Sequence, residues 1–257
     1  MSEETAPPTA FKPKKSVALS GTPAGNTALC TVGHSGNDLH YRGYDIKDLA
    51  AHCEYEEVAH LLVHGKLPTA AELAAYKARL KPLRSLPAAL KQALELLPPS
   101  THPMDVLRTG VSVLGCIEPE GAAHDDAGAR AIADRLLASL GSMLLYWHHF
   151  ARNGKRLEVE TDDDSIAAHF LHLLHGKKPS AEWTQAMQVS LILYAEHEFN
   201  ASTFAARITA STNSDFYSAI TSAIGTLRGN LHGGANEAVM HMILPLKSTE
   251  QAEADVR

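Results

Sequence analysis

Cysteine is scarce in this sequence of 257 residues, and the pattern of the three that occur excludes two common uses of the residue. Cys30, Cys53 and Cys116 are far apart, odd in number and outside any CxxC motif. Neither a disulfide framework nor a cysteine zinc site is therefore expected. A reducing compartment fits such a chain best, and we expect a cytoplasmic protein.

Other absences narrow the class of protein further. No uninterrupted apolar run is long enough to cross a bilayer, so the sequence predicts no membrane anchor. Neither GxGxxG after a strand nor GxxxxGK occurs, so a Rossmann or P-loop nucleotide site finds no support. The net charge is −6 and the basic residues are scattered, which argues against a nucleic-acid surface. The expected partners are small molecules or copies of the same chain.

The pattern of apolar residues predicts a mostly helical protein with a small N-terminal β region. Residues 1–15 are polar and contain proline, and we interpret them as a flexible tail. Residues 16–46 contain brief alternating runs rich in Gly, Asn, Thr and Val, which are typical of small strands and turns. From Ile46 onward, apolar residues recur every three or four positions, which predicts helices with buried faces.

Capping residues mark the expected ends of several helices. The acidic run at 161–164 and Gly176 enclose one predicted helix. Ser180 is the N-cap candidate of the next helix, whose nearly continuous apolar sequence predicts a place in the middle of the domain. Ser214 is the N-cap candidate of a later helix, which Gly229 would close as the residue after its C-cap.

The stretch GNLHGGANEAV places His232 in a glycine-flanked loop between two predicted helices. Gly233 and Gly234 have no side chains, so we expect open backbone amides beside the imidazole. The positive end of the following helix and burial both disfavour the imidazolium, which predicts a neutral ring that donates a hydrogen bond. Such a group suits the polarisation of a carbonyl during enolisation. The alternative is a glycine-rich connection that happens to hold a solvated histidine.

A second polar cluster follows an otherwise apolar helix in the stretch YAEHEFNAST. It contains Glu196, His197, Glu198 and Asn200, an arrangement expected at the mouth of a pocket for a small polar ligand. The alternative is an ordinary helix end at which Asn200 or Ser202 caps the next helix. Two helices separate this cluster from the glycine-rich loop, and the two clusters together indicate a site more strongly than either alone.

Several other polar residues are considered as site candidates. Three histidines lie at i, i+3 and i+6 along one helical stripe: His169, His172 and His175. Helical zinc ligands more often use i, i+4 spacing, and no acidic ligand is interleaved, so we predict no metal. Asp215 directly follows the predicted N-cap serine, which favours helix-dipole stabilisation over catalysis. Arg79, on a helix face, is kept as a candidate contact for an anionic substrate, whereas Arg42 is interpreted as a surface charge.

The two histidine motifs carry a resemblance to a known family. LYAEHEFNASTFAAR followed by GTLRGNLHGGANEAV resembles the citrate synthase family. The longer runs KPKKSVALSGTPAGNTALCTVG, HPMDVLRTGVS and TDDDSIAAHFLHLLHG are similar to its methylcitrate branch, and the likeness covers the chain from about Lys12 on. It implies a citrate synthase-like helical large domain at 16–232 and the start of a small domain at 233–257.

The resemblance also implies an activity. Members of the family are dimeric acyltransferases that condense an acyl-CoA with oxaloacetate, and in the methylcitrate branch propionyl-CoA gives 2-methylcitrate and CoA during propionate breakdown. By position, His232 matches the histidine that hydrogen-bonds the thioester carbonyl and stabilises its enol, and His197 matches the one that holds oxaloacetate. The resemblance implies no metal and no cofactor, because the acyl-CoA is a substrate.

Two alternatives remain open beside the methylcitrate assignment. A citrate synthase that uses acetyl-CoA differs by one methylene of substrate, which gives only about 1–3 kcal/mol of discrimination. A non-catalytic helical protein that binds a ligand or a partner would retain the same fold.

The sequence departs from the family pattern at two places. Asn230 stands where the family usually has proline, which would loosen the backbone before His232. The family's second catalytic histidine, in GFGHxVY, and its catalytic aspartate follow the glycine-rich loop, and neither occurs up to Arg257. Asp215 cannot replace that aspartate because it precedes the loop. We therefore expect a C-terminally truncated sequence that is inactive by itself.

Overall fold

The computed structural model describes residues 25–33 and 38–256, so the tail predicted at 1–15 lies outside the described residues. The strands are β1 (Cys30–Val32), β2 (Leu39–Tyr41) and β3 (Tyr44–Asp45). The helices are α1 (Ile46–His52), α2 (Tyr55–His64), α3 (Ala70–Leu80), α4 (Ala88–Glu95), α5 (Pro103–Ile117), α6 (Asp126–Asn153), α7 (Ile166–His175), α8 (Ala181–Leu193), α9 (Ala201–Ser211), α10 (Phe216–Leu227), α11 (Gly234–Ile243) and α12 (Thr249–Val256), with a 3-10 turn η1 (Lys81–Arg84). The predicted mostly helical fold with a small N-terminal sheet is confirmed.

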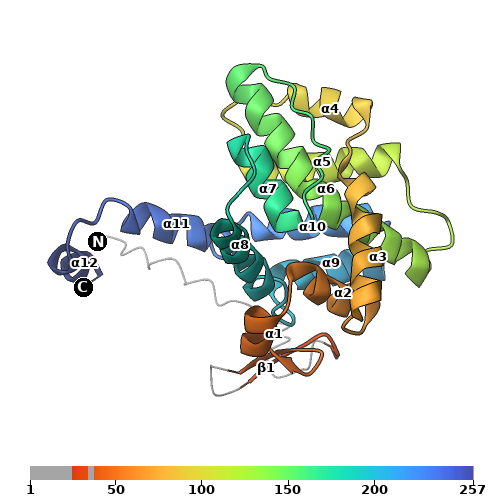
Figure 1. Ribbon diagram of the computed structural model, residues 1–257, viewed down its shortest axis with the longest axis horizontal. Coiled ribbons are helices and arrows are strands. Elements are labelled where there is room, and N and C mark those ends of the chain that lie inside the picture. Colours follow the sequence, from red (N-terminus) through yellow and green to blue (C-terminus); the bar gives the residue numbers. More distant parts are fainter. Residues whose placement is uncertain (1–24, 34–37, 257) are drawn as a thin grey trace, which may run out of the picture.

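The three strands form a small antiparallel sheet in the order β1-β2-β3 (Figure 1). Tyr41 of β2 is fully buried, and its hydroxyl donates to the backbone carbonyl of Ile192 at 3.0 Å. The same hydroxyl accepts the backbone N–H of Glu196 at 3.3 Å. The sheet is therefore fastened to the end of α8, directly before the predicted polar cluster.

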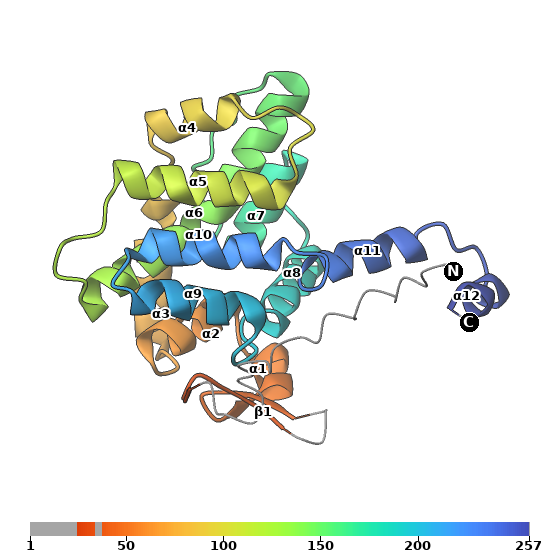
Figure 2. The ribbon, with the colours of Figure 1, turned by 180° about the vertical axis from the view of Figure 1, so that it is seen from behind.

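The main apolar core lies around α6, which packs against α4, α5 and α7. Met143 and Tyr146 of α6 are buried in this core. α5 and α10 lie side by side in Figures 1 and 2, and Gly115 of α5 lies against Tyr217 of α10. A Cβ atom at Gly115 would stand 2.7 Å from the Cβ of Tyr217, so a larger residue there would push the two helices apart.

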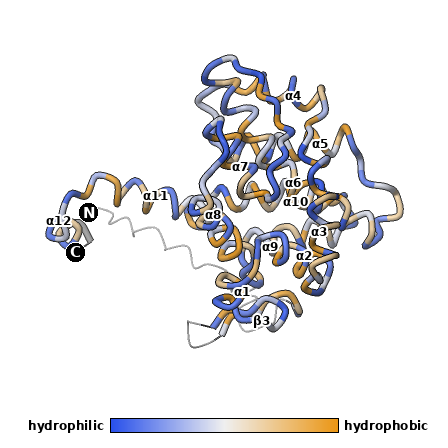
Figure 3. The backbone as a smooth tube through the Cα atoms, viewed as in Figure 1, coloured by the Kyte–Doolittle hydropathy of each residue, from blue (hydrophilic) through white to orange (hydrophobic). Residues whose placement is uncertain are grey.

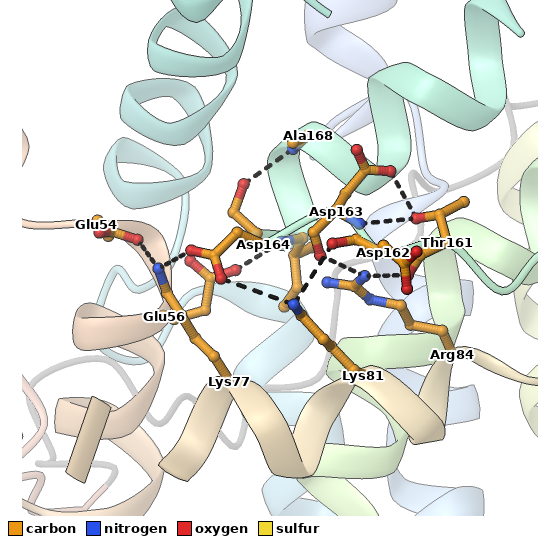
Figure 4. A network of polar contacts seen from close by, with 12 residues as sticks. Glu54, Glu56, Lys77, Lys81, Arg84, Thr161, Asp162, Asp163, Asp164 and Ala168 are labelled. Atoms are coloured by element: carbon orange, nitrogen blue, oxygen red, sulfur yellow. Dashed lines mark hydrogen bonds and ion pairs between the residues drawn. The ribbon is translucent and has the colours of Figure 1, made fainter. Parts of the chain in front are cut away.

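The acidic run predicted to start a helix lies directly before α7, and buried cations hold it there (Figure 4). The guanidinium of Arg84, of which 2% is exposed, donates to the backbone carbonyls of Thr161 and Asp163 at 3.2 and 2.7 Å. Lys77 donates to the carboxylate of Asp164 at 2.7 Å. Because a buried carbonyl without a partner is costly, these bonds allow an irregular segment to pack against the core.

The predictions for the ends of α7 and α8 are confirmed. Ser165 caps α7 at the end of the acidic run, and Gly176 ends the helix in the left-handed conformation with φ +67°. The Ser180 hydroxyl accepts the N–H of Trp183 at the start of α8. The predicted central position of α8 is wrong, because Trp183 is 66% exposed and only Gln188 and Ile192 of this helix are buried.

The predicted cap of α10 is also wrong by one residue. Asp215, not Ser214, is the N-cap, and its carboxylate accepts the N–H of Ser218 at 2.9 Å. Burial alone would raise the pKa of Asp215, but the hydrogen bonds from Ser218 hold it below its usual range. Gly229 follows the C-cap as predicted, although without a left-handed φ.

α11 and α12 project from the helical body (Figure 1). α11 contains hydrophobic stretches, seen in orange in Figure 3, but it buries no residue. The exposed apolar side chains of α11 include Met240 and Met242, and Leu244 directly after the helix is exposed as well. Within the described ranges, no helix has the length and apolar character needed to cross a membrane.

Candidate functional site

The two predicted histidine motifs meet in the structure at one end of a helical hairpin. His197 lies in the loop before α9, and His232 lies in the loop after α10. α9 and α10 are joined by a short connection and pack against each other, so the beginning of α9 lies next to the end of α10 (Figure 2). Ser202 in α9 and His232 after α10, which are 30 positions apart in the sequence, thereby come into contact.

His232 makes its side-chain contacts with Ser202, in the first turn of α9. Its Nε2 atom lies 2.9 Å from the Ser202 hydroxyl and accepts the Ser202 backbone N–H at 3.3 Å. The Ser202 hydroxyl also donates to the Asn200 side-chain oxygen at 2.7 Å, so a chain of hydrogen bonds runs from the cap of α9 to the imidazole. Nε2 of the ring is thus held by Ser202, while Nδ1 has no hydrogen-bond partner within the described residues.

The first turn of α9 is fixed by its own cap. The Asn200 side-chain oxygen accepts the N–H of Thr203 at 2.9 Å and lies 2.7 Å from the Ser202 hydroxyl. The expectation that Asn200 could cap the next helix is confirmed, so this polar cluster is in part a structural helix start. The capping residue also orders Ser202, the partner of His232.

His197 lies three residues before that cap. Its carbonyl accepts the backbone N–H of Asn200 at 3.3 Å, which ties its backbone to the start of α9. Its imidazole is exposed and makes no hydrogen bond with the described part of the chain. The ring is therefore open to a ligand, while its position is set by the backbone.

The glutamates beside His197 fasten this loop to the β region. Glu198 has a positive φ of 54°, and its carboxylate accepts the backbone N–H of Val32 at 2.9 Å. Burial raises the pKa of Glu196, whose backbone N–H donates to the Tyr41 hydroxyl. Both glutamates therefore bind residues of the β region and fix the conformation of the loop before α9.

The glycines after His232 serve close packing. A Cβ atom at Gly233 would lie 2.6 Å from the carbonyl oxygen of Leu227, so the loop can fold back on the end of α10 only with glycine there. The N–H of Gly234 donates to the carbonyl of Gly229 at 3.1 Å. The expected open amide at Gly234 is therefore wrong, because the turn itself uses that donor.

A comparison with protein families decides the family. The family model described as citrate synthase, C-terminal domain, matches residues 18–257. The chain belongs to the citrate synthase family.

Relatives and solved structures agree with this family. A 2-methylcitrate synthase of Shewanella oneidensis is 59% identical over 239 residues, which are 93% of this chain and 62% of that protein. A 2-methylcitrate synthase of Mycobacterium tuberculosis is 43% identical, over 98% of this chain and 64% of that protein. This member of the family thus spans less than two thirds of the length of these relatives.

Two citrate synthase structures share the fold. The crystal structure of the Thermotoga maritima enzyme aligns with a TM-score of 0.81 at 32% identity, over 95% of this chain and 64% of that one. The enzyme of Thermoplasma acidophilum, in a ternary complex with carboxymethyl coenzyme A and oxaloacetate, aligns with a TM-score of 0.83 at 30% identity, over 91% of this chain and 61% of that one.

Arg79, the third predicted site residue of this citrate synthase family chain, lies on α3, which packs against α2, α6 and η1. Its guanidinium donates to the buried carboxylate of Asp134 at 2.7 Å and to Nε2 of His64 at 3.1 Å. The ring of Tyr76 lies 5.0 Å below it. The structure therefore joins Arg79 to an internal carboxylate and does not bring it to the histidine motifs.

Two of the three helical histidines, His169 and His172, are linked through Thr161 and Asp163, whereas the third is exposed. His169 is buried, with Nε2 3.1 Å from the Ser142 hydroxyl and Nδ1 3.0 Å from that of Thr161. His172 pairs with Asp163 at 2.7 Å, and His175 is exposed. No group of three or more His, Cys, Asp or Glu side chains within residues 25–33 and 38–256 is arranged to hold a metal.

Sequence reasoning missed the role of Ser202 as the partner of His232. Its place in the first turn of a predicted helix pointed to capping, and the cap is in fact Asn200. The usable signal was the short connection between α9 and α10, because an antiparallel hairpin must bring the start of one helix to the end of the other.

Proposed function

We propose that the complete protein is a 2-methylcitrate synthase, which condenses propionyl-CoA with oxaloacetate and water to 2-methylcitrate and CoA. The observation that carries the proposal is the meeting of the two histidine motifs, where Ser202 holds Nε2 of His232 and no residue of the described part of the chain contacts Nδ1. The name 2-methylcitrate synthase on relatives 59% and 43% identical to the chain supports the choice of thioester.

In this mechanism His232 stabilises the enol of the thioester. Removal of the α-proton places negative charge on the thioester oxygen, and a donor already in position lowers the free energy of that transition state. Ser202 occupies Nε2, so the proposed donor to the thioester oxygen is Nδ1–H of a neutral ring. A neutral imidazole is a weak acid, so it donates the hydrogen bond without releasing its proton to solvent.

The exposed His197 binds oxaloacetate in the same proposal. A dicarboxylate with a keto group requires hydrogen-bond donors, and the imidazole of His197 is unoccupied within the described residues. The backbone of His197 is hydrogen-bonded to Asn200, the N-cap of α9, and Ser202 lies in the first turn of that helix. One helix end therefore positions both the oxaloacetate contact and the partner of the enol donor. Nucleophile and electrophile would then meet at the mouth between the two loops.

Citrate synthase activity with acetyl-CoA is the second candidate. It is favoured by a 40% identical relative from Bacillus subtilis named citrate/2-methylcitrate synthase. Comparison of kcat/KM for propionyl-CoA and acetyl-CoA with the complete gene product separates the two. We expect roughly a tenfold or greater preference for propionyl-CoA, as one methylene allows. A preference for acetyl-CoA would contradict the proposal.

We also propose a homodimer of two-domain subunits in the cytoplasm, with a domain boundary at 232/233. The projection of α11 and α12 from the body supports the boundary (Figure 1). α9 buries none of its residues within one copy, which leaves helix surface for a second copy. Analytical ultracentrifugation of the complete protein should give the mass of two chains; a monomer at micromolar concentration would contradict this assembly.

A further inference from the structure

The helix that follows His232 has few attachments to the rest of the molecule. α11 buries no residue. Two side-chain hydrogen bonds join it to the body described by the structure. Asn236 donates to the Tyr194 hydroxyl at 3.4 Å, and Glu237 lies with its carboxylate 2.9 Å from Nε2 of His102. Both residues lie in the first turn of α11, immediately after the His232 loop.

His102 is oriented for the contact with Glu237 by its own helix. It is the N-cap of α5, and its Nδ1 accepts the backbone N–H of Met104 at 3.1 Å. Since that N–H can only donate, Nδ1 carries no proton in this state and the proton is on Nε2. Nε2–H therefore donates to the Glu237 carboxylate, and the hydrogen bond from His102 lowers the pKa of Glu237.

The first turn of α5 holds the other end of the loop as well. Asp105 forms an ion pair with Arg228, with 3.6 Å between the carboxylate and Nε. Arg228 precedes His232 by four residues, and Glu237 follows it by five. The start of α5 thus lies beside the junction of α10 and α11 in Figure 2 and contacts the chain on both sides of the histidine.

We propose that the pair His102–Glu237, here called the α5 latch, is a positioning element for His232. The inference rests on the proposed function, in which His232 is the enol donor. Ser202 sets the direction of the ring, whereas the α5 latch sets the backbone from which the ring projects. An error of about 1 Å in the position of a catalytic group costs as much as 10²-fold in rate, so a latch outside the reacting atoms can matter for turnover.

Substitutions at the latch can separate it from helix capping. His102→Asn keeps a good N-cap side chain for α5, because an asparagine oxygen replaces Nδ1, but it is too short to reach Glu237. Glu237→Ala removes the acceptor from the other side. Met242→Leu is the matched control, since Met242 lies exposed on the same helix outside the latch.

Hydrogen–deuterium exchange tests the latch without reference to activity. In the 257-residue chain, His102→Asn and Glu237→Ala should each make the backbone amides of residues 234–243 exchange about fivefold faster, because local opening of α11 becomes easier. The double variant should show no further increase, and Met242→Leu should match the wild type. Unchanged exchange in both single variants would overturn the proposal.

Kinetics then test the effect on the reaction. In the complete protein, His102→Asn and Glu237→Ala should lower kcat by about 5- to 100-fold and change KM for oxaloacetate by less than about twofold, because the donor to the thioester is displaced while the His197 side is untouched. The double variant should be no slower than the slower single variant. If the amides of residues 234–243 exchange faster in these variants but kcat is unchanged, the latch stabilises α11 without positioning His232, and the proposal is overturned. A wild type without turnover would contradict the proposed function, while the exchange data still judge the latch.

Discussion

At the scale of single residues, the environment of each histidine decides its chemistry. Nε2 of His232 is held by the hydroxyl and the backbone N–H of Ser202, and its Nδ1 has no hydrogen-bond partner within the described residues. His169 is neutral because it is buried between two hydroxyl groups, and both of its ring nitrogens are occupied. His175, six residues along the same helix, is exposed. At His232 one ring nitrogen therefore stays available for a substrate.

His169 predicts a pH dependence of stability. Burial, followed by the charge of Arg84, lowers its pKa from 6.5 to about 4 in the folded state. The unfolded chain binds this proton first, so the free energy of unfolding is unaffected by the group above pH 6.5 and falls as the pH drops toward 4. A shift of this size corresponds to roughly 3 kcal/mol.

Urea unfolding between pH 7 and 4 measures this effect. His169→Gln should lose stability at pH 7, because one hydrogen bond disappears, but should show a shallower decline toward pH 4 than the wild type. His175→Gln should keep the wild-type slope. Equal slopes in all three proteins would show that His169 does not carry the pH dependence.

At the scale of helices, the cap of α10 shows why boundaries are harder to predict than helices. Ser214 and Asp215 are both good N-cap residues, and the sequence does not distinguish them. The structure selects Asp215, whose carboxylate accepts the Ser218 N–H. The choice depends on how the α9–α10 connection closes, which is a tertiary property.

The two candidate caps can be compared directly. Asp215→Ala should lower the free energy of unfolding by about 1 kcal/mol, because the helix loses its side-chain cap. Ser214→Ala should change it by less than about 0.5 kcal/mol. Chemical denaturation of both variants gives the answer, and a larger loss in Ser214→Ala would place the cap at the serine.

The contact between α5 and α10 depends on the absence of a side chain at Gly115. Gly115→Ala would place a Cβ atom 2.7 Å from that of Tyr217, and the helices must separate. We expect a loss of about 1–3 kcal/mol in unfolding free energy, despite the better helix propensity of alanine. Gly121→Ala is the control because its Cβ would meet no atom within 4 Å. Thermal melts of both variants decide the matter, and an equal or higher melting temperature for Gly115→Ala would contradict the close contact.

The same helices show how far the sequence could predict the structure. Apolar spacing and caps such as Ser180 and Gly176 reveal local structure, because they depend on neighbours a few residues away. The exposure of Trp183 on α8 escaped prediction, since an apolar sequence does not say how many neighbours a helix has. Both histidines of the candidate site could be identified from their motifs, whereas Ser202 and Glu237 depend on packing between distant elements.

At the scale of the whole molecule, the small sheet, α5, α8 and the α9–α10 hairpin converge on one region. The sheet holds the end of α8 through Tyr41, the hairpin brings Ser202 to His232, and the start of α5 contacts both sides of the His232 loop. α11 continues from this junction away from the body (Figure 1). The fold thus places the proposed enol donor at the base of a projecting helix.

The most direct test of the account is steady-state turnover of the complete protein with propionyl-CoA and oxaloacetate, measured for the wild type and His232→Ala. If the histidine donates to the enolate oxygen, the substitution should lower kcat by about 10²- to 10³-fold, as the loss of one preorganised donor does. Its melting temperature should stay near that of the wild type, because His232 is not part of the apolar core. A folded His232→Ala protein with wild-type kcat would contradict the central claim.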